Sequence, residues 1–173
     1  MGQFFYKMSG YSRKGGFMRR EKAMALFEEG YNCAQAVVLA FADLHGLDQT
    51  TAAALSSSFG GGMGRLREVC GAVSGMFLTA GMLYGYDSPK AAEEKAEHYA
   101  RIQELAAEFE KRNGSIVCRE LLGLGRKRDE PTPEARTEEY YKKRPCKELV
   151  GDAAEILEGY IKEHPMTRER SEC

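Results

Sequence analysis

The sequence lacks tryptophan and has almost no net charge, and both shortages narrow the class of protein. Nine Tyr and eight Phe residues are enough to fill a core without tryptophan. The formal net charge is −1, which excludes a broad basic surface, so we expect no nucleic-acid partner. The 173 residues, 43% of them hydrophobic, correspond to one globular domain that can bury its own core.

Long apolar segments are also missing. The longest uncharged run covers residues 69–86 and would extend over roughly 26 Å as a helix, slightly less than a bilayer core. We therefore expect it to be a buried core helix and predict no membrane span. Residues 1–17 do not contain the apolar stretch of a signal peptide. A cytoplasmic location follows as an expectation, and with it reduced cysteines.

Alternating β-branched patterns are scarce, whereas helical spacing of apolar residues recurs along the chain. The fold class that this predicts is all-α, a single-domain bundle of about six to seven helices. Residues 18–165 would form the domain, residues 1–17 a disordered segment or extension, and residues 166–173 a flexible tail. Caps, glycines and prolines place the helices at 19–29, 33–44, 49–56, 68–84, 89–112, 115–123 and 145–164.

The apolar central helix contains glycines at a spacing of four, including Gly71 and Gly75. A glycine inside a helix costs about 1 kcal/mol relative to alanine, so a compensating role is expected. One explanation is close approach of a neighbouring helix. The other is room for a bound group, which would make Gly71 and Gly75 cofactor-binding residues.

The sequence has no Cys-x-x-Cys and no Cys/His pair at zinc-finger spacing, which excludes the common metal modules. Four of its five cysteines instead lie at or beside a predicted helix start, where backbone N–H groups and the helix dipole favour a thiolate. We expect a lowered pKa at each of them. They are Cys33 after Asn32, Cys70 after Val69, Cys118 near Ser115, and Cys146 after Pro145.

Two of these cysteines share a short repeat. Residues 118–123 and 146–151 both read Cys, base, Glu, Leu, aliphatic, Gly. Basic neighbours would lower the thiol pKa further, and they are Arg119 beside Cys118 and Lys143, Arg144 and Lys147 beside Cys146. We expect Cys118 and Cys146 to be the most reactive pair, whereas Cys173 ends a polar tail and is interpreted as an exposed bystander.

Other interpretations stay open at this point. Free cysteines often only fill core space, so the chain could be a helical interaction module with structural cysteines, or a homodimer through the glycine-bearing helix. Converging thiolates could also hold zinc or an iron–sulfur cluster. In that reading Cys33, Cys70, Cys118 and Cys146 are metal ligands, whereas in the thiol-redox reading no cofactor is required.

At these residues the sequence resembles the C_GCAxxG_C_C family of redox proteins. The resemblance covers roughly residues 18–164, and the family label reads Gly-Cys-Ala where this chain reads Cys-Gly-Ala. It implies a redox role, with Cys33, Cys70, Cys118 and Cys146 as the defining residues. The segments that carry it are residues 32–35, residues 59–64, residues 70–75, Cys118 and Cys146.

The leading hypothesis is a thiol oxidoreductase or electron-transfer protein. Cys118 and Cys146 would cycle between dithiol and disulfide, and Cys33 and Cys70 would form a second pair or act as resolving thiols. A redox partner protein would supply the electrons.

Overall fold

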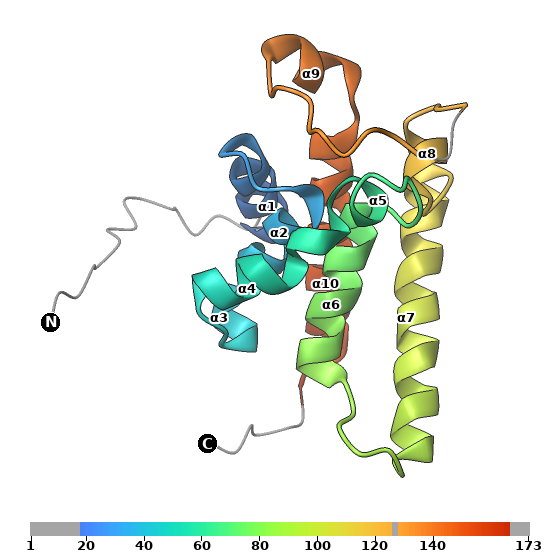
Figure 1. The fold of residues 1–173 in the computed structure, drawn as a ribbon. Helices are drawn as coiled ribbons and strands as arrows, with labels where there is room; N and C mark the ends of the chain where they lie inside the picture. The colour runs from blue at the N-terminus through green and yellow to red at the C-terminus, as the bar shows by residue number, and fades with distance from the viewer. Residues whose placement is uncertain (1–17, 126–127, 167–173) are drawn as a thin grey trace, which may run out of the picture.

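The computed structural model describes residues 18–125 and 128–166 and is helical throughout its regular structure (Figure 1). Six of the described helices have eight residues or more, which confirms the all-α prediction. In chain order the elements are α1 (Met18–Glu28), α2 (Cys33–Ala40), α3 (Ala42–His45), α4 (Gln49–Ser56), the 3₁₀ turn η1 (Ser57–Phe59), α5 (Gly60–Met63), α6 (Gly71–Tyr84), α7 (Ala92–Asn113), α8 (Cys118–Leu121), α9 (Glu138–Lys143) and α10 (Cys146–Glu163).

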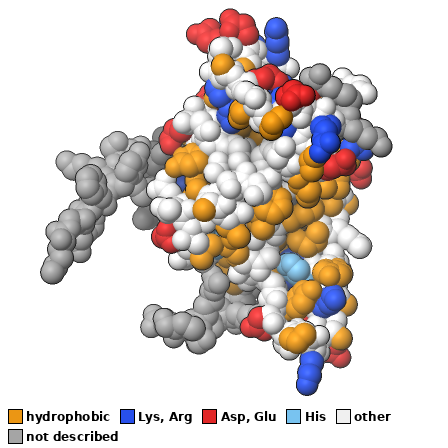
Figure 2. Space-filling model, viewed as in Figure 1, with side chains coloured by type: hydrophobic (Ala, Val, Ile, Leu, Met, Phe, Trp, Pro, Cys, Tyr) orange, Lys and Arg blue, Asp and Glu red, His pale blue; other side chains and the backbone are white. Residues whose placement is uncertain are grey.

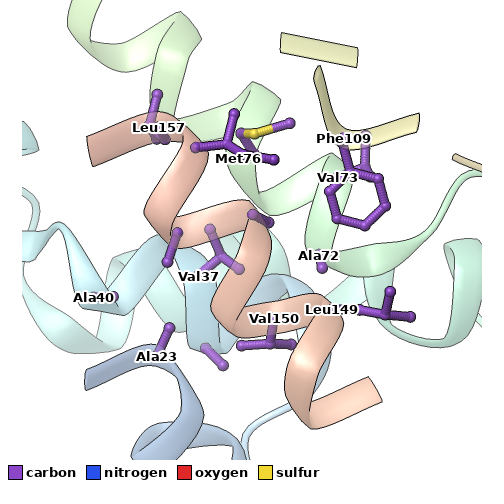
Figure 3. Packing of buried hydrophobic residues seen from close by; sticks show 14 of the residues in the cluster. Ala23, Val37, Ala40, Ala72, Val73, Met76, Phe109, Leu149, Val150 and Leu157 are labelled. Carbon is purple, nitrogen blue, oxygen red and sulfur yellow. The ribbon is translucent and has the colours of Figure 1, made fainter. Parts of the chain in front are cut away.

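The core lies where α1, α2, α6, α7 and α10 pack together. Figure 3 shows Val150 and Leu157 of α10 among side chains that include Val37 of α2 and Met76 of α6. Each of these four side chains is at least 95% buried. Phe109 of α7 closes the cluster on one side. The apolar helix α6 is therefore a buried core helix, as predicted.

Membrane crossing is not a property of the described helices, since none combines enough length with enough apolarity. The predicted extension 1–17 lies outside the described residues, and so does the predicted tail apart from Met166.

The helix predicted at 33–44 is in fact two helices with a break at Phe41. The guanidinium of Arg19 donates to the carbonyl oxygen of Ala40 at 2.6 Å and lies over the Phe41 ring. That carbonyl would have accepted from Leu44 in a continuous helix, and the Leu44 N–H instead bonds Phe41 at 2.9 Å. A distant arginine thus ends α2.

Two other predicted helix starts shift, and one helix was not predicted. The helix expected from Pro89 begins at Ala92, because the Ser88 hydroxyl accepts from Lys90 within a tight turn. The helix expected from residue 68 begins at Gly71, after an extended segment. Helix α9 was not predicted, although Thr137 caps it through a 3.3 Å bond from the Tyr140 N–H.

Candidate functional site

Cys33 is the first residue of α2, and its position is fixed by the residue before it. The Asn32 side chain accepts from the N–H groups of Ala34 and Gln35 at 3.0 Å, and Gln35 returns a bond to the Asn32 N–H. These reciprocal bonds form a capping box, which fixes the N-terminus of α2. The Asn32 amide also donates to the Ser57 carbonyl at 2.9 Å, which ties Cys33 to the turn before residues 60–64, a segment called the glycine loop below.

Cys70 and Cys118 are brought together by a short extended contact that the sequence pattern does not reveal. Val69 and Val117 form an isolated antiparallel bridge. Beside it the Cys70 N–H donates to Ile116 at 2.8 Å, and the Cys118 N–H donates to Glu68 at 2.6 Å. Cys70 is the residue before α6 and Cys118 is the first residue of α8. Backbone hydrogen bonds therefore fix Cys70 opposite Ile116 and Cys118 opposite Glu68, so the two cysteines flank the same bridge.

The glycine loop makes the close approach of these elements feasible. Gly62 has φ +69°, and a Cβ on it would lie 2.6 Å from the Cβ of Cys118. A Cβ on Gly71 would lie 3.0 Å from the Cβ of Cys33 and 2.9 Å from the Phe59 carbonyl oxygen. Both glycines are thus needed where cysteine-bearing segments meet.

Gly75 has a different neighbour. A Cβ there would lie 2.7 Å from the Ala34 carbonyl oxygen, so the space beside Gly75 is filled by α2. Close helix approach, one of the two explanations offered for the α6 glycines, is what the structure has at this position. Gly71 also lines the cavity described below, whereas Gly75 does not.

Cys146 is the first residue of α10, directly after Pro145. Its thiol interacts with that of Cys33, which acts as the hydrogen-bond donor. Cys118 and Cys146 do occupy the same helix position, as their repeated sequence suggests. The partner of Cys146 in this contact is nevertheless Cys33, whereas Cys118 contacts Arg67.

All four cysteines line one cavity of about 270 Å³, at the end of the molecule that holds α8 and α9. They are free thiols, with Cys33 half-buried and the other three buried. The glycine loop, Tyr140 of α9 and the proline-containing segment before α9 complete the wall. Four cysteines that are far apart in the sequence thus share one cavity.

The four thiols differ in their ionisation. The hydrogen bond from Cys33 lowers the pKa of Cys146 to about 7, against the effect of burial and with help from Arg144, Arg67 and Arg136. Donating that bond raises the pKa of Cys33 well above its ordinary value, and burial adds to the effect. The lowered pKa that we expected at every helix start is therefore wrong at Cys33.

The expectation is also wrong at the other pair. Burial raises the pKa of Cys70 to about 12, although N–H groups of α6 point at it. Burial also raises the pKa of Cys118, and the hydrogen bond from Arg67 only partly offsets this. Desolvation of a thiolate thus exceeds the helix-terminus effect at these two positions.

Arg144 lies two residues before Cys146 and lowers the pKa of its thiol, as sequence proximity indicated, and Arg67 and Arg136 add to this effect from distant segments. Arg67 is 3% exposed, and its Nη1 lies 3.7 Å from the Cys118 Sγ. It is held by Asp129, with the Arg67 Nε at 2.8 Å and Nη2 at 2.5 Å from Oδ2. Arg136 belongs to the segment between α8 and α9. Lys147, by contrast, pairs with Glu28 at 2.5 Å.

Metal binding makes a stricter geometric demand than a shared cavity. Within residues 18–125 and 128–166, no group of three or more His, Cys, Asp or Glu side chains is placed to hold a metal ion. The four thiols share a cavity but are not arranged around one point in this conformation.

Comparison with known proteins gives one result. The family model described as "Putative redox-active protein (C_GCAxxG_C_C)" matches residues 31–160. Comparisons with curated proteins and with solved structures gave no significant match to the chain. The matched segment begins just before the Asn32 cap and includes all four site cysteines, and it covers well over half of the sequence. The chain therefore belongs to the C_GCAxxG_C_C family.

Proposed function

We propose that this protein is a thiol–disulfide redox protein in which Cys146 is the attacking thiolate and Cys33 its partner. The observation that carries the proposal is the contact between these two thiols, in which Cys146 has a pKa of about 7 and Cys33 keeps its proton. A nucleophilic thiol works best when its pKa is near the ambient pH. The pair therefore has an ionised nucleophile next to a protonated second thiol at neutral pH.

The reaction is a two-step exchange with a disulfide substrate. The Cys146 thiolate attacks one substrate sulfur, forming a mixed disulfide and expelling the other sulfur as a thiolate. Cys33 then loses its proton to the solvent or to that leaving group and attacks the Cys146 sulfur. The second substrate thiolate leaves, a Cys33–Cys146 disulfide forms, and the substrate has gained two electrons.

Cys70 and Cys118 would supply a second dithiol at the same cavity. Their raised pKa values keep them protonated at neutral pH, so they would react after the first pair. Exchange of the Cys33–Cys146 disulfide with them would regenerate the first dithiol and leave a Cys70–Cys118 disulfide. A dithiol partner protein in a reducing compartment such as the cytoplasm would complete the cycle by reducing that bond.

The test is disulfide mapping after limited oxidation. Reduced protein is treated with one equivalent of diamide, its remaining thiols are alkylated, and its peptides are analysed without reduction. We expect a Cys33–Cys146 crosslink with Cys70 and Cys118 alkylated. A crosslink from Cys146 to Cys118 would replace the assigned pair, and an unchanged thiol count would remove the proposal.

A second candidate, a metal or iron–sulfur protein, is favoured by one observation: four thiols line a single cavity. Side-chain rotation would have to bring at least three of them to one point. Elemental analysis and an absorption spectrum of protein purified without oxygen and without a metal-chelating tag decide between the candidates. Stoichiometric zinc or iron that is lost in Cys70→Ser would support this second function and demote the dithiol cycle.

A further inference from the structure

The cavity that holds the thiols is also lined by four arginines. They are Arg65, Arg67, Arg136 and Arg144. Figure 2 shows basic and acidic side chains side by side at the end of the molecule that carries α8 and α9. Carboxylates of the chain already pair with some of these arginines.

Three of the four arginines have carboxylate partners. Asp129 binds Arg67 at 2.5 Å and Arg65 at 3.4 Å. Glu134 binds Arg144 at 2.5 Å and lies 3.7 Å from Arg65. Two carboxylates are thus shared among three guanidinium groups.

Arg136 is the exception, because it pairs with no carboxylate among the residues that the structure describes. Its guanidinium donates to the carbonyl oxygens of Phe27 at 2.9 Å and Tyr31 at 3.0 Å. It also lies over the rings of Phe27 and Tyr140, 4.2 Å and 5.4 Å from their centroids. These contacts fix the position of the charge without neutralising it.

The Cys146 thiolate does not neutralise all of the positive charge that the arginines leave unpaired. Among the residues that the structure describes, four guanidinium groups face two carboxylates, so two positive charges are left over, and the thiolate can match one of them. One positive charge remains for a ligand, in a partly desolvated place where an anion interacts strongly. The cavity is therefore electrostatically complementary to an anion that sits beside Cys146.

The size and walls of the cavity say what kind of anion fits. A volume of about 270 Å³ is far larger than a bare oxyanion needs and is in the range of a small organic molecule. Beside the arginines the lining includes Leu121, Leu122, Leu149, Pro131 and Pro133. These apolar side chains suit a carbon skeleton and offer nothing to a hydrated ion.

We propose that the substrate of this site is a small organic disulfide that carries a carboxylate, with the carboxylate on Arg136 and the disulfide against Cys146. The inference rests on the proposed thiol–disulfide function. Cys146 attacks the substrate sulfur and forms a mixed disulfide as the first substrate thiolate leaves. Cys33 displaces the second, so one dithiol becomes one protein disulfide and one substrate disulfide becomes two thiols, at least one of which carries a carboxylate.

Three small disulfides of similar length and different charge test this directly. They are dithiodiglycolate with two carboxylates, 2-hydroxyethyl disulfide with none, and cystamine with two ammonium groups. Loss of protein thiols is followed at pH 7 with each, and each rate is divided by the rate of 2-mercaptoethanol with the same compound. We expect the normalised rate to be about tenfold higher for dithiodiglycolate than for the neutral compound, and lowest for cystamine.

Variants at Arg136 then show whether the preference comes from this residue. Arg136→Gln should bring the ratio of anionic to neutral rate close to one, and Arg136→Lys should retain part of it. Comparing two substrates within each variant cancels any change in the ionisation of Cys146. Arg112→Gln is the matched control, because Arg112 pairs with Glu108 and Glu155 and does not line the cavity. Circular dichroism and thermal unfolding verify that each variant is folded.

The possible outcomes separate the inference from the function beneath it. If no disulfide oxidises the protein, the thiol–disulfide function itself fails. If all three react with equal normalised rates, that function stands and the assignment of an anionic substrate is overturned. A preference that survives in folded Arg136→Gln also overturns the role given to Arg136.

Discussion

The two cysteine pairs of this protein occupy similar helix positions and yet are held in different ways. Cys33 and Cys146 meet through their side chains, with three arginines acting on Cys146. Cys70 and Cys118 are positioned by backbone hydrogen bonds around the Val69–Val117 bridge. One pair has an ionised member at neutral pH and the other has none.

The difference shows that a helix start is not sufficient to make a reactive thiol. The dipole and the N–H groups contribute a favourable interaction that burial readily exceeds. What distinguishes Cys146 is a second thiol that donates a hydrogen bond to it, together with Arg144 nearby in the sequence and Arg67 and Arg136 from distant segments. The lowered pKa of Cys146 therefore depends on tertiary contacts.

The largest expected contrast is in alkylation rate. At pH 7 a thiol with a pKa of about 7 is about half ionised, whereas at a pKa of about 12 the ionised fraction is about 10⁻⁵. The lower nucleophilicity of the less basic thiolate offsets about two powers of ten, so Cys146 should react about 10³-fold faster than Cys70. Timed iodoacetamide labelling with peptide mass spectrometry measures both rates in one sample.

The matched variants for this contrast are Cys146→Ser and Cys70→Ser. The first should remove the fast phase, and the second should leave it unchanged. A fast phase that persists in Cys146→Ser and maps to Cys118 would contradict the assignment and restore the pair expected from the repeated sequence.

A smaller effect concerns the hydrogen bond inside the reactive pair. Because the Cys33 thiol donates to the Cys146 thiolate, its removal in Cys33→Ala should raise the pKa of Cys146 by about one unit. The pH midpoint of alkylation should then move upward from about 7. At pH 6 the ionised fraction falls about tenfold while the more basic thiolate is about 2.5-fold more nucleophilic, so the rate should fall about fourfold. The measurement is the labelling rate of Cys146 between pH 5 and pH 10.

Cys33→Ser provides the control for that shift, because a hydroxyl can still donate. Its midpoint should stay near that of the unmodified protein. If serine and alanine move the midpoint equally, the arginines and not the hydrogen bond set the pKa of Cys146.

Local signals in the sequence were enough for much of the fold. The Asn32 and Asp48 caps set the starts of α2 and α4, and Gly114 ends α7. Each of these interactions joins residues within one turn, so its chemistry can be seen in a few letters. The four site cysteines were identified for the same reason, since their positions beside helix starts are local.

What the sequence could not reveal depends on contacts between distant segments. Arg67 reaches Cys118 across 51 positions and is fixed by Asp129, a further 11 residues along the chain. Arg136 belongs to a segment whose prolines and charges indicate only a surface loop. The break at Phe41 likewise needs Arg19, which lies 21 residues before the carbonyl that it binds. No local sequence pattern predicts such pairings.

The smallest effect, and the one that links the pairs to the packing, is at Gly71. In Gly71→Ala the new methyl group would meet the Cβ of Cys33 at 3.0 Å and the Phe59 carbonyl at 2.9 Å, so α2 or the glycine loop must move. We expect a loss of about 1–3 kcal/mol in the free energy of unfolding, measured by urea denaturation. Gly81→Ala, in the same helix, should instead gain up to about 1 kcal/mol in the free energy of unfolding, because the nearest neighbour of the new methyl group is 4.0 Å away.

The displacement at Gly71 should also lower the yield of the Cys33–Cys146 crosslink while leaving Cys118 in place. Equal stability of the two variants would mean that the close approach of α6 to Cys33 is not required, and that the first pair is held by its side chains alone.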